Sequence, residues 1–192
     1  MTFIAFEGGE GSGKSTQARL LADALGALLT HEPGGTPVGR SLRAMVLDAG
    51  GEPLDARAEA LVLLADRAQH VASVIRPALA AGRAVVCDRF SGSTLAYQGY
   101  GRGLAVDELS AMSRWASGGL EPDLVVLLDV VVGRVSGELD RMESAGVAFH
   151  ARVAAGYRAL AAVSPGRWAV VDGSGTVEEV AALVRKAVDE RL

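Results

Sequence analysis

The sequence contains a single cysteine, few prolines and no membrane-length apolar stretch. Cys87 has no second cysteine to pair with, so we expect a reducing compartment such as the cytoplasm. The first residues carry neither the basic flank nor the cleavage site of a secretion signal, and no apolar run is long enough to span a bilayer. These absences argue against a membrane partner.

The sequence also has no block of basic residues. Its formal net charge is −4 and the basic residues are spread along the chain, which argues against nucleic acid as a principal partner. A small phosphorylated substrate fits this charge better. Because 49% of the residues are hydrophobic, 22% are charged and no Pro-rich or low-complexity linker interrupts them, we expect a single domain over residues 1–192.

A glycine-rich segment stands directly after the first apolar run and before a helical pattern. This context of strand, loop and helix is the one that a phosphate-binding loop requires. Glycines let several backbone N–H groups converge on phosphate oxygens, and the N-terminus of the following helix adds positive charge. Lys14 would neutralise the β and γ phosphates of a nucleoside triphosphate, while Ser15 would bind Mg²⁺. The residues predicted to bind ATP are Gly8, Gly9, Glu10, Gly11, Ser12, Gly13, Lys14, Ser15 and Thr16.

Short apolar runs alternate with helical patterns along the rest of the chain. We expect strands near residues 2–7, 27–30, 84–87, 124–128 and 168–171, and helices over 14–25, 38–48, 56–81 and from about 176. Continuous apolar strands are typical of a parallel sheet buried on both faces, which indicates an α/β fold. Each expected strand has an acid at or just after its carboxyl end, namely Glu7, Glu32, Asp88, Asp129 and Asp172. Ligands of such sheets bind beyond the carboxyl ends of the strands, so we expect these acids to surround one crevice.

Several arginines could complete that crevice. Arg89 follows Asp88 directly after a buried strand and could reach a second phosphate that the loop does not cover, while Asp88 could hold Mg²⁺ through water. Arg43 and Arg67 could point the same way, although either one alone would more often be a solvated or core-edge residue. Converging arginines suit phosphoryl transfer, because this reaction depends on positioning and charge neutralisation.

Several blocks of sequence together resemble the thymidylate kinase family. They are Phe-Glu-Gly-Gly-Glu-Gly-Ser-Gly-Lys-Ser-Thr-Gln (6–17), Glu-Pro-Gly-Gly-Thr-Pro (32–37), Ala-Asp-Arg-Ala-Gln-His (65–70), Asp-Arg-Phe (88–90), Ala-Tyr-Gln-Gly (96–99) and Gly-Arg-Gly (101–103). Their order and spacing agree over nearly the whole chain. The resemblance implies a P-loop NTPase fold with five parallel strands surrounded by helices. It also implies transfer of the ATP γ-phosphate to dTMP in dTTP synthesis, with Mg²⁺, and a homodimer built by packing helices.

The resemblance also assigns roles to individual positions. Glu10 corresponds to an acid near the sugar 3′-hydroxyl, Arg43 and Arg89 to a pair on the acceptor phosphate, and Arg67 to the arginine that reads the thymine edge. Thr94 lies where a polar residue helps to recognise the base. Tyr97 lies where a ring crowds the 2′ position and disfavours a ribonucleotide. The predicted dTMP set is Glu10, Arg43, Leu63, Arg67, Arg89, Thr94, Tyr97 and Gln98, and the predicted metal ligands are Ser15 and Asp88.

The sequence departs from the family pattern at two places. Leu63 stands where many members carry an aromatic residue, so a thymine would have apolar contact there without stacking. The spacer of the loop has no basic residue, as in members that supply arginines from a lid, yet the lid of this chain, about residues 133–142, looks short. We expect Arg134 and Arg141 of this lid to act with Lys14 and Arg89 as the catalytic residues.

These departures keep two alternatives open. A related nucleotide or nucleoside kinase with another acceptor is favoured if Leu63 marks a changed base pocket. An ATP-binding protein without transfer activity follows if the short lid abolishes transfer. Glu10, Arg89 and Tyr97 argue against the second alternative, because a protein that only binds ATP has no need of contacts to an acceptor.

Overall fold

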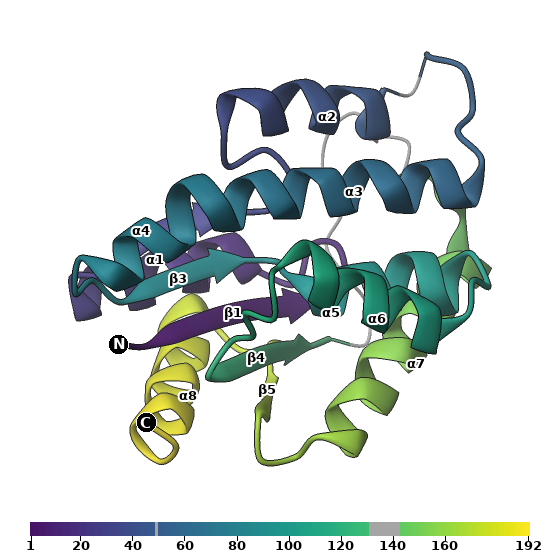
Figure 1. The fold of residues 1–192 in the computed structure, drawn as a ribbon. Helices are drawn as coiled ribbons and strands as arrows, with labels where there is room; N and C mark the ends of the chain where they lie inside the picture. Colours follow the sequence, from purple (N-terminus) through teal and green to yellow (C-terminus); the bar gives the residue numbers. More distant parts are fainter. Residues whose placement is uncertain (49, 131–142) are drawn as a thin grey trace.

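The computed structural model describes residues 1–48, 50–130 and 143–192 of the chain (Figure 1). Within these ranges five strands form one parallel sheet in the order β2-β3-β1-β4-β5. The strands are β1 (Phe3–Gly8), β2 (Leu28–His31), β3 (Val85–Asp88), β4 (Leu124–Asp129) and β5 (Trp168–Asp172). The expected α/β class and all five strands are confirmed. Since β1 lies at the centre of the sheet, the glycine-rich loop that follows it opens at the middle of the carboxyl edge.

The three central strands β1, β3 and β4 are buried on both faces, as their continuous apolar sequences predict, whereas Val170 of the edge strand β5 is 56% exposed. Alternate residues of β1 belong to opposite cores: Ile4 and Phe6 pack with the helices α1 (Lys14–Leu25) and α8 (Val177–Asp189), whereas Phe3 and Ala5 pack on the other face. Tyr157 of α7 joins a further cluster on β4. Figure 1 shows α3 above the sheet, α1 behind β3 and α8 below β1. A strand between two apolar layers has no solvent-facing side, and the alternating pattern of an exposed sheet is therefore missing.

The helices next to the phosphate loop and at the C-terminus begin and end where local signals predict. α1 (Lys14–Leu25) ends at Gly26, whose φ of 60° belongs to the left-handed region that glycine tolerates. α8 (Val177–Asp189) begins with a capping box: the Glu179 backbone N–H donates to Thr176 Oγ1, and the Thr176 N–H donates to the Glu179 carboxylate. α2 (Pro37–Leu47) starts similarly at Thr36, whose hydroxyl accepts from the Gly39 N–H at 2.8 Å.

The helix expected over residues 56–81 is divided in the structure. It consists of α3 (Ala56–His70), a π-helical turn η1 (Val71–Ile75) and α4 (Arg76–Ala80). The wider turn shifts the helical phase, so one apolar stripe does not run along the whole segment. Leu64 is buried whereas Leu61, one turn before it on α3, is 55% exposed. The buried side of α3 is instead largely polar, and periodicity of apolar residues cannot reveal such a face.

Several helical segments have no counterpart in the sequence prediction. They are α5 (Ser91–Thr94), the π-helix η2 (Leu95–Gly101), α6 (Val106–Ala116), the short 3₁₀ turn η3 (Glu143–Ala145) and α7 (Val147–Val163). Residues 91–101 contain three glycines, which disfavour a helix in isolation, so packing against α7 and α6 determines this segment. α5 and η2 follow Arg89 immediately and carry Thr94, Tyr97 and Gln98. None of the described helices combines the length and the apolar character needed to cross a membrane.

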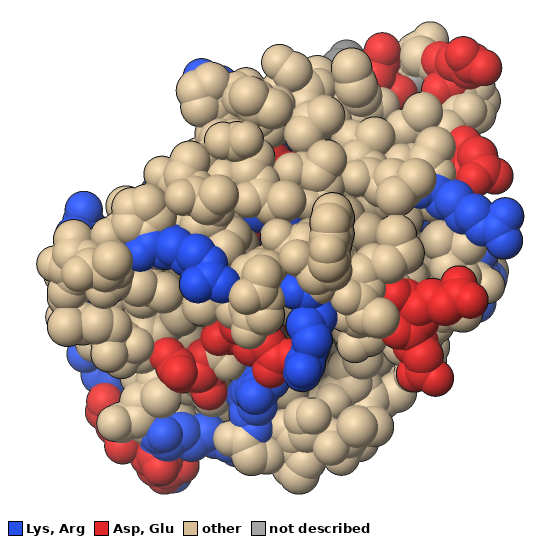
Figure 2. All heavy atoms as spheres, in the orientation of Figure 1, with Lys and Arg blue, Asp and Glu red and all other residues tan. Residues whose placement is uncertain are grey.

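Charged side chains of both signs lie close together on the surface. Arg114 and Arg167 both form ion pairs with Glu121, and Figure 2 shows basic groups next to acidic ones on the face in view. This mixture agrees with the even spread of charge along the sequence.

Candidate functional site

Two hollows lie side by side at the carboxyl edge of the sheet. The first, which we call the loop hollow, is lined by residues 10–16, Arg19, residues 29–32, Arg43, Asp88 and Arg89. The second, the side pocket, is lined by Glu10, Glu32, Pro33, Arg43, Val46, Leu47, Leu63, Asp66, Arg67, Arg89, Phe90, Ser93, Thr94, Tyr97 and Gln98. Glu10, Glu32, Arg43 and Arg89 therefore border both hollows. Every residue predicted from the sequence to bind dTMP lines the side pocket.

The glycine-rich loop has the backbone geometry of an anion cradle. Gly8 has a φ of 145°, and a Cβ atom on it would lie 2.6 Å from the carbonyl oxygen of Leu128, so only glycine fits there. Gly11 and Gly13 also have positive φ values, 66° and 85°. α1 begins at Lys14, and the first N–H groups of a helix have no partners within the helix. These groups, together with the Lys14 ammonium, give the loop hollow donors and positive charge for an anionic ligand.

Lys14 is buried among groups of the loop itself. Its Nζ donates to the Gly9 carbonyl oxygen at 2.6 Å and to Ser12 Oγ at 3.3 Å. Burial lowers the pKa of Lys14 to about 8, and the nearby Arg89 charge lowers it too, against the opposing effects of Glu10 and Asp88. The lysine is therefore only partly charged in mildly alkaline solution. A bound anion would favour its charged form.

Ser15 and Asp88 offer oxygen ligands that fit Mg²⁺. The Ser15 hydroxyl donates to Asp88 Oδ2 at 2.5 Å, which joins the start of α1 to the end of β3. Asp88 Oδ1 is buried and has no hydrogen-bond partner within the described part of the chain. Nor do the described residues contain a cluster of three or more His, Cys, Asp or Glu side chains suited to a metal. Mg²⁺ commonly takes few protein ligands and completes its shell with water and phosphate oxygens, so this sparse oxygen pair suits it.

Arg89 occupies the boundary between the two hollows. Its Nη2 donates to Glu10 Oε1 at 2.5 Å and to Tyr97 Oη at 3.3 Å. Its Nη1 lies within 3.3 Å of Gly8 O, Ser93 Oγ and Tyr157 Oη. The residue has a φ of 69°, the one positive φ of a non-glycine residue in residues 1–48, 50–130 and 143–192. Such backbone strain persists where surrounding contacts hold it, and it is common at functional sites.

Glu7 provides much of that support. Its Oε1 accepts from the backbone N–H groups of Phe90 and Ser93, both at 3.0 Å. Its Oε2 accepts from the hydroxyls of Ser93 and Tyr157 at 2.6 and 3.1 Å. Burial raises the pKa of Glu7, against the effects of Ser93 and Arg89. Glu7 therefore holds the segment after Arg89 in place and does not line either hollow, although the sequence predicted it among the crevice acids.

Glu10 is a carboxylate held between positive groups. It accepts from Arg89 and, at 2.6 Å, from the Tyr97 hydroxyl. Burial opposes its ionisation, but Arg89 and Lys14 together with the Tyr97 hydrogen bond lower its pKa. Burial raises the pKa of Tyr97, so this phenol keeps its proton and donates it to Glu10. Glu10 therefore presents a fixed carboxylate to both hollows, whereas Tyr97 lines only the side pocket.

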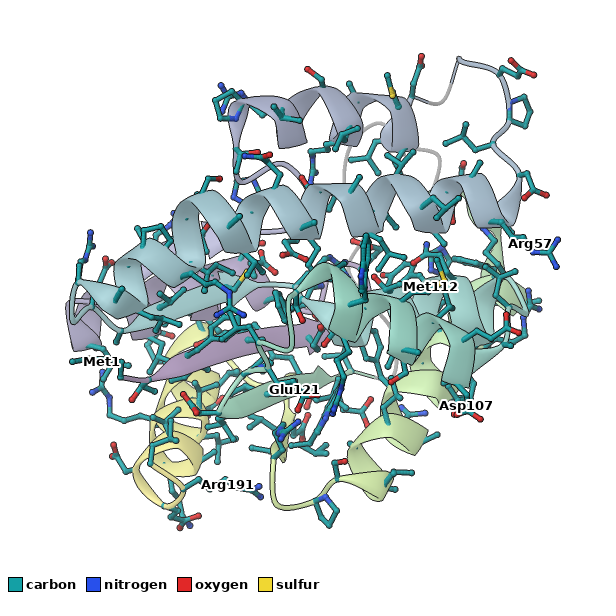
Figure 3. All side chains as sticks on the ribbon, in the orientation of Figure 1. Met1, Arg57, Asp107, Met112, Glu121 and Arg191 are labelled. Atoms are coloured by element: carbon teal, nitrogen blue, oxygen red, sulfur yellow. The ribbon has the colours of Figure 1, made fainter. Side chains whose placement is uncertain are left out.

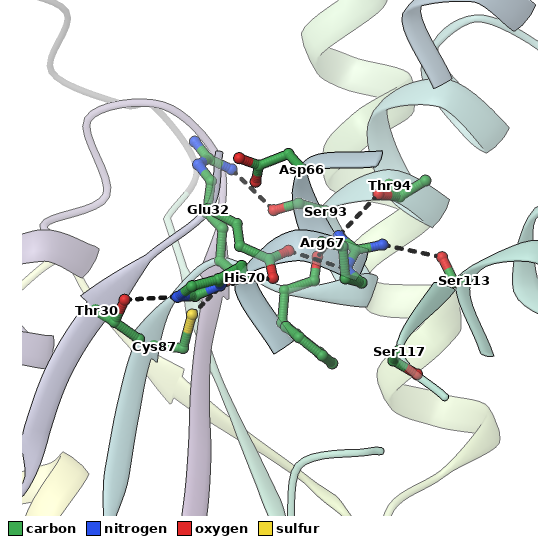
Figure 4. A network of polar contacts seen from close by, with 12 residues as sticks. Thr30, Glu32, Asp66, Arg67, His70, Cys87, Ser93, Thr94, Ser113 and Ser117 are labelled. Carbon is green, nitrogen blue, oxygen red and sulfur yellow. Dashed lines mark hydrogen bonds and ion pairs between the residues drawn. The ribbon is translucent and has the colours of Figure 1, made fainter. Parts of the chain in front are cut away.

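A buried network forms one wall of the side pocket (Figure 4). Arg67 donates from Nε to Glu32 at 2.9 Å, from Nη1 to Ser113 at 3.0 Å, and from Nη2 to Phe90 O and Thr94 Oγ1. The other Glu32 oxygen contacts His70 Nδ1, and His70 Nε2 lies 2.6 Å from Thr30 Oγ1. Glu32 and His70 thus fix Arg67 in position. Sequence reasoning missed this supporting set, although the Glu-Pro-Gly-Gly block marked its first member.

Of the remaining residues predicted from the sequence, some line the hollows and others do not. Arg43 donates to the Pro33 carbonyl oxygen at 2.9 Å from the outer rim, and Leu63 adds apolar surface from α3. Two expected crevice acids were predicted wrongly. Asp129 is paired with Arg158 at 2.8 Å, and Asp172 accepts from the Ser174 backbone N–H. They follow β4 and β5, whereas the hollows border the loops after β1, β2 and β3. Arg134, Arg141 and the predicted lid lie outside the described residues.

Comparisons with known proteins agree on one family. The family model described as "Thymidylate kinase" matches residues 6–184. The thymidylate kinase of Desulfovibrio desulfuricans is 49% identical over 209 residues, which cover 99% of this chain and 96% of the relative. The thymidylate kinase of Gloeobacter violaceus is 50% identical over 200 residues, with 97% and 94% covered. The crystal structure of thymidylate kinase from Ehrlichia chaffeensis superposes with a TM-score of 0.83 at 33% identity, covering 98% of both chains.

Proposed function

Because the chain belongs to the thymidylate kinase family, we propose that its two hollows hold the two substrates of that reaction, ATP in the loop hollow and dTMP in the side pocket. The enzyme phosphorylates dTMP to dTDP. The observation that carries the assignment is the shared border: Glu10, Arg43 and Arg89 line both hollows. Phosphoryl transfer needs donor and acceptor phosphates in contact, and a common wall of arginines brings them together.

We assign the donor phosphates to the loop of residues 8–16. Its backbone N–H groups and the start of α1 bind the β and γ phosphates, and Lys14 neutralises their charge. Ser15 and Asp88 would hold Mg²⁺, which supplies positive charge at the transferring phosphate and orients it. The Ser15–Asp88 contact and the unpartnered Asp88 oxygen support this assignment.

The acceptor phosphate is proposed to lie against Arg89 and Arg43. In the reaction, an anionic oxygen of the dTMP phosphate forms a bond to the γ-phosphorus while the bond from that phosphorus to the bridging β,γ oxygen breaks, and ADP leaves. No general base is required, because the attacking oxygen already carries a negative charge. The chain's own contribution is to align the two phosphates and to neutralise their repulsion, which Arg89 does from its fixed position beside Glu10.

The nucleoside of dTMP is proposed to fill the inner part of the side pocket. Glu10 would face the sugar hydroxyl and Tyr97 the 2′ position, where a ribose hydroxyl would lack room. Leu63 and Phe90 offer apolar contact to the base, and Arg67, Thr94 and Gln98 offer polar contact. We also propose that the chain is of the type whose phosphate-binding loop has no basic residue in its spacer and whose lid supplies arginines. Arg134 and Arg141 of a short lid are then proposed catalytic residues.

A coupled assay of ADP release with dTMP tests the proposal. We expect turnover that depends on both nucleotides and a preference for dTMP over dCMP, dGMP and thymidine. ATP binding without any dTMP-dependent ADP release would exclude the assigned transfer and favour the alternative of an ATP-binding protein. Faster turnover of another acceptor would instead favour a related kinase with a changed base pocket around Leu63.

The charge state of Lys14 predicts a pH dependence of ATP binding. With a pKa of about 8 in the free enzyme, the lysine is mostly charged at pH 7 and mostly neutral at pH 9. We therefore expect the dissociation constant of a non-hydrolysable ATP analogue to rise severalfold between these pH values, and binding at pH 8.5 to take up protons. Isothermal titration calorimetry in buffers of different ionisation enthalpy measures both. The Lys14→Arg variant is the control, since arginine does not titrate in this range, and pH-independent binding by the wild type would contradict the assignment.

We also propose a single kinase domain over residues 1–192, a homodimer and a cytoplasmic location. Support for a dimer comes from exposed apolar side chains on α3 and α6, helices that contact each other. Leu61 on α3 is 55% exposed, and on α6 Met112 and Trp115 are 37% and 85% exposed (Figure 3 labels Met112). Large exposed apolar side chains grouped on neighbouring helices are typical of an interface. The reduced, buried Cys87 is consistent with the cytoplasm.

The dimer proposal predicts the effect of a charge at Trp115. We expect the wild type to sediment at twice the mass of the chain and the Trp115→Glu variant to sediment as a monomer, because a carboxylate would be desolvated in the interface. Analytical ultracentrifugation measures both, and Val163→Glu, at an 83% exposed position on α7, serves as the control. A wild type that is monomeric at high micromolar concentration would exclude the dimer.

A further inference from the structure

Gln98 carries a buried acceptor that no described residue satisfies. The residue lies on η2, is 1% exposed, and lines the side pocket. Its Nε2 donates to Glu59 Oε1 at 2.9 Å, whereas its Oε1 has no hydrogen-bond partner within the described ranges. A buried carbonyl oxygen without a partner is unfavourable, so its presence in a native structure needs an explanation. A ligand in the side pocket that brings a hydrogen-bond donor to this oxygen would supply one.

Glu59 determines which end of the Gln98 amide faces the pocket. A carboxylate can only accept hydrogen bonds, so the NH₂ group of Gln98 must turn toward it and the carbonyl oxygen must turn away. Glu59 is itself 1% exposed near the start of α3. Arg102 donates to both of its oxygens, from Nε at 3.2 Å and from Nη2 at 3.0 Å. The guanidinium lies 4.7 Å from the centre of the Phe149 ring, which holds it in place.

The side pocket thus combines an oriented acceptor with an oriented donor. Arg67 has only donors, and its contacts to described residues use four of its five N–H groups. A base that carries an N–H next to a carbonyl oxygen, as thymine and uracil do at N3 and O4, complements an acceptor beside a donor. Cytosine has an acceptor at N3 and a donor amino group at C4, which is the opposite pattern.

We propose that Glu59, held by Arg102, is a positioning residue that fixes the orientation of the Gln98 amide and thereby makes the enzyme select 4-oxo over 4-amino pyrimidine nucleotides. The inference rests on the proposed dTMP site in the side pocket. Glu59 does not need to touch the nucleotide, because it acts through Gln98. The preference for thymine over cytosine would then depend on a contact behind the wall of the pocket as well as on the residues that line it.

The Glu59→Gln variant tests this role. A glutamine at position 59 can present either its oxygen or its NH₂ group, so the Gln98 amide is no longer held in one orientation. We expect the ratio of kcat/KM for dTMP to that for dCMP to fall about tenfold, as for the loss of one discriminating hydrogen bond. The ratio of dTMP to dUMP should stay unchanged, since both bases have the N3–H and O4 groups, and the KM for ATP should stay unchanged. Glu121→Gln, the same replacement at a surface ion pair, serves as the control.

A double-mutant cycle distinguishes positioning from a merely structural role. The Gln98→Leu variant should lower the dTMP to dCMP ratio by a similar factor, and adding Glu59→Gln to it should lower the ratio no further. Equal losses for dTMP and dCMP in Glu59→Gln, or additive effects in the double variant, would overturn the proposal. If Glu59→Gln does not fold, an unchanged ratio in Gln98→Leu alone would overturn it. Failure of the proposed dTMP site itself has a different signature, namely no dTMP-dependent ADP release by the wild type.

Discussion

The Arg89→Ala variant is expected to lose about a thousandfold in kcat/KM for dTMP while its affinity for ATP changes only a few-fold. Arg89 lies between the two hollows and contacts Glu10, Ser93, Tyr97 and Tyr157. Alanine removes both the positive charge facing the acceptor phosphate and the planar group that fixes Glu10. The loss falls on the transfer step, since the loop and Lys14 would still bind ATP.

Steady-state kinetics with each substrate varied in turn, together with calorimetric ATP titration, measures this difference. The Arg89→Lys variant is the matched control, because it keeps a charge but cannot form the forked contacts of a guanidinium, and we expect an intermediate loss. Thermal unfolding must accompany both, since Arg89 also neutralises Glu10 within the fold. Losses of equal size for dTMP turnover and ATP affinity would contradict the location of the acceptor phosphate beside Arg89.

The second large effect is expected at Lys14. We expect Lys14→Ala to lower kcat by about a thousandfold and to weaken ATP binding as well, because Lys14 is the only basic residue within the loop of residues 8–16. The ammonium also bridges the loop internally, so its loss would loosen the cradle of backbone N–H groups. Unlike Arg89→Ala, this variant should affect both substrates of the reaction.

Single-turnover measurements at saturating ATP separate the loss of binding from the loss of transfer. Lys186→Ala provides the control, since Lys186 is the other lysine of the sequence and lies on α8, where it pairs with Glu190. We expect no change in that variant. The thermal midpoint of Lys14→Ala should not fall, because the buried ammonium is penalised by desolvation in the free enzyme. Near-normal turnover in Lys14→Ala would contradict the assignment of the loop hollow as the ATP site.

The resemblance to thymidylate kinases identified which residues line the side pocket, but it did not identify which other residues those side chains contact. All the residues predicted to bind dTMP line the pocket, yet no sequence pattern indicated that Arg67 is held by Glu32, Ser113 and Thr94. Those partners lie 27 to 46 positions away. Contacts between such distant residues leave no periodic pattern, so spacing rules could not reveal them. The same reason explains why Glu7 was expected in the crevice and instead supports the backbone after Arg89.

Taken alone, the sequence determined the features that local rules encode. The glycines at positions 8 and 26 are required by local backbone angles, and the capping box of α8 is formed by hydrogen bonds between Thr176 and Glu179. The continuous apolar strands reflect the burial of each strand. Only the tertiary structure decided which partners the acidic and amide side chains have. It buried Glu7 and Glu32 as supports, paired Asp129 with Arg158, and paired the NH₂ group of Gln98 with Glu59. The physical reason is that the role of a buried polar group depends on which partner satisfies it, and that partner is brought close only when the whole chain folds.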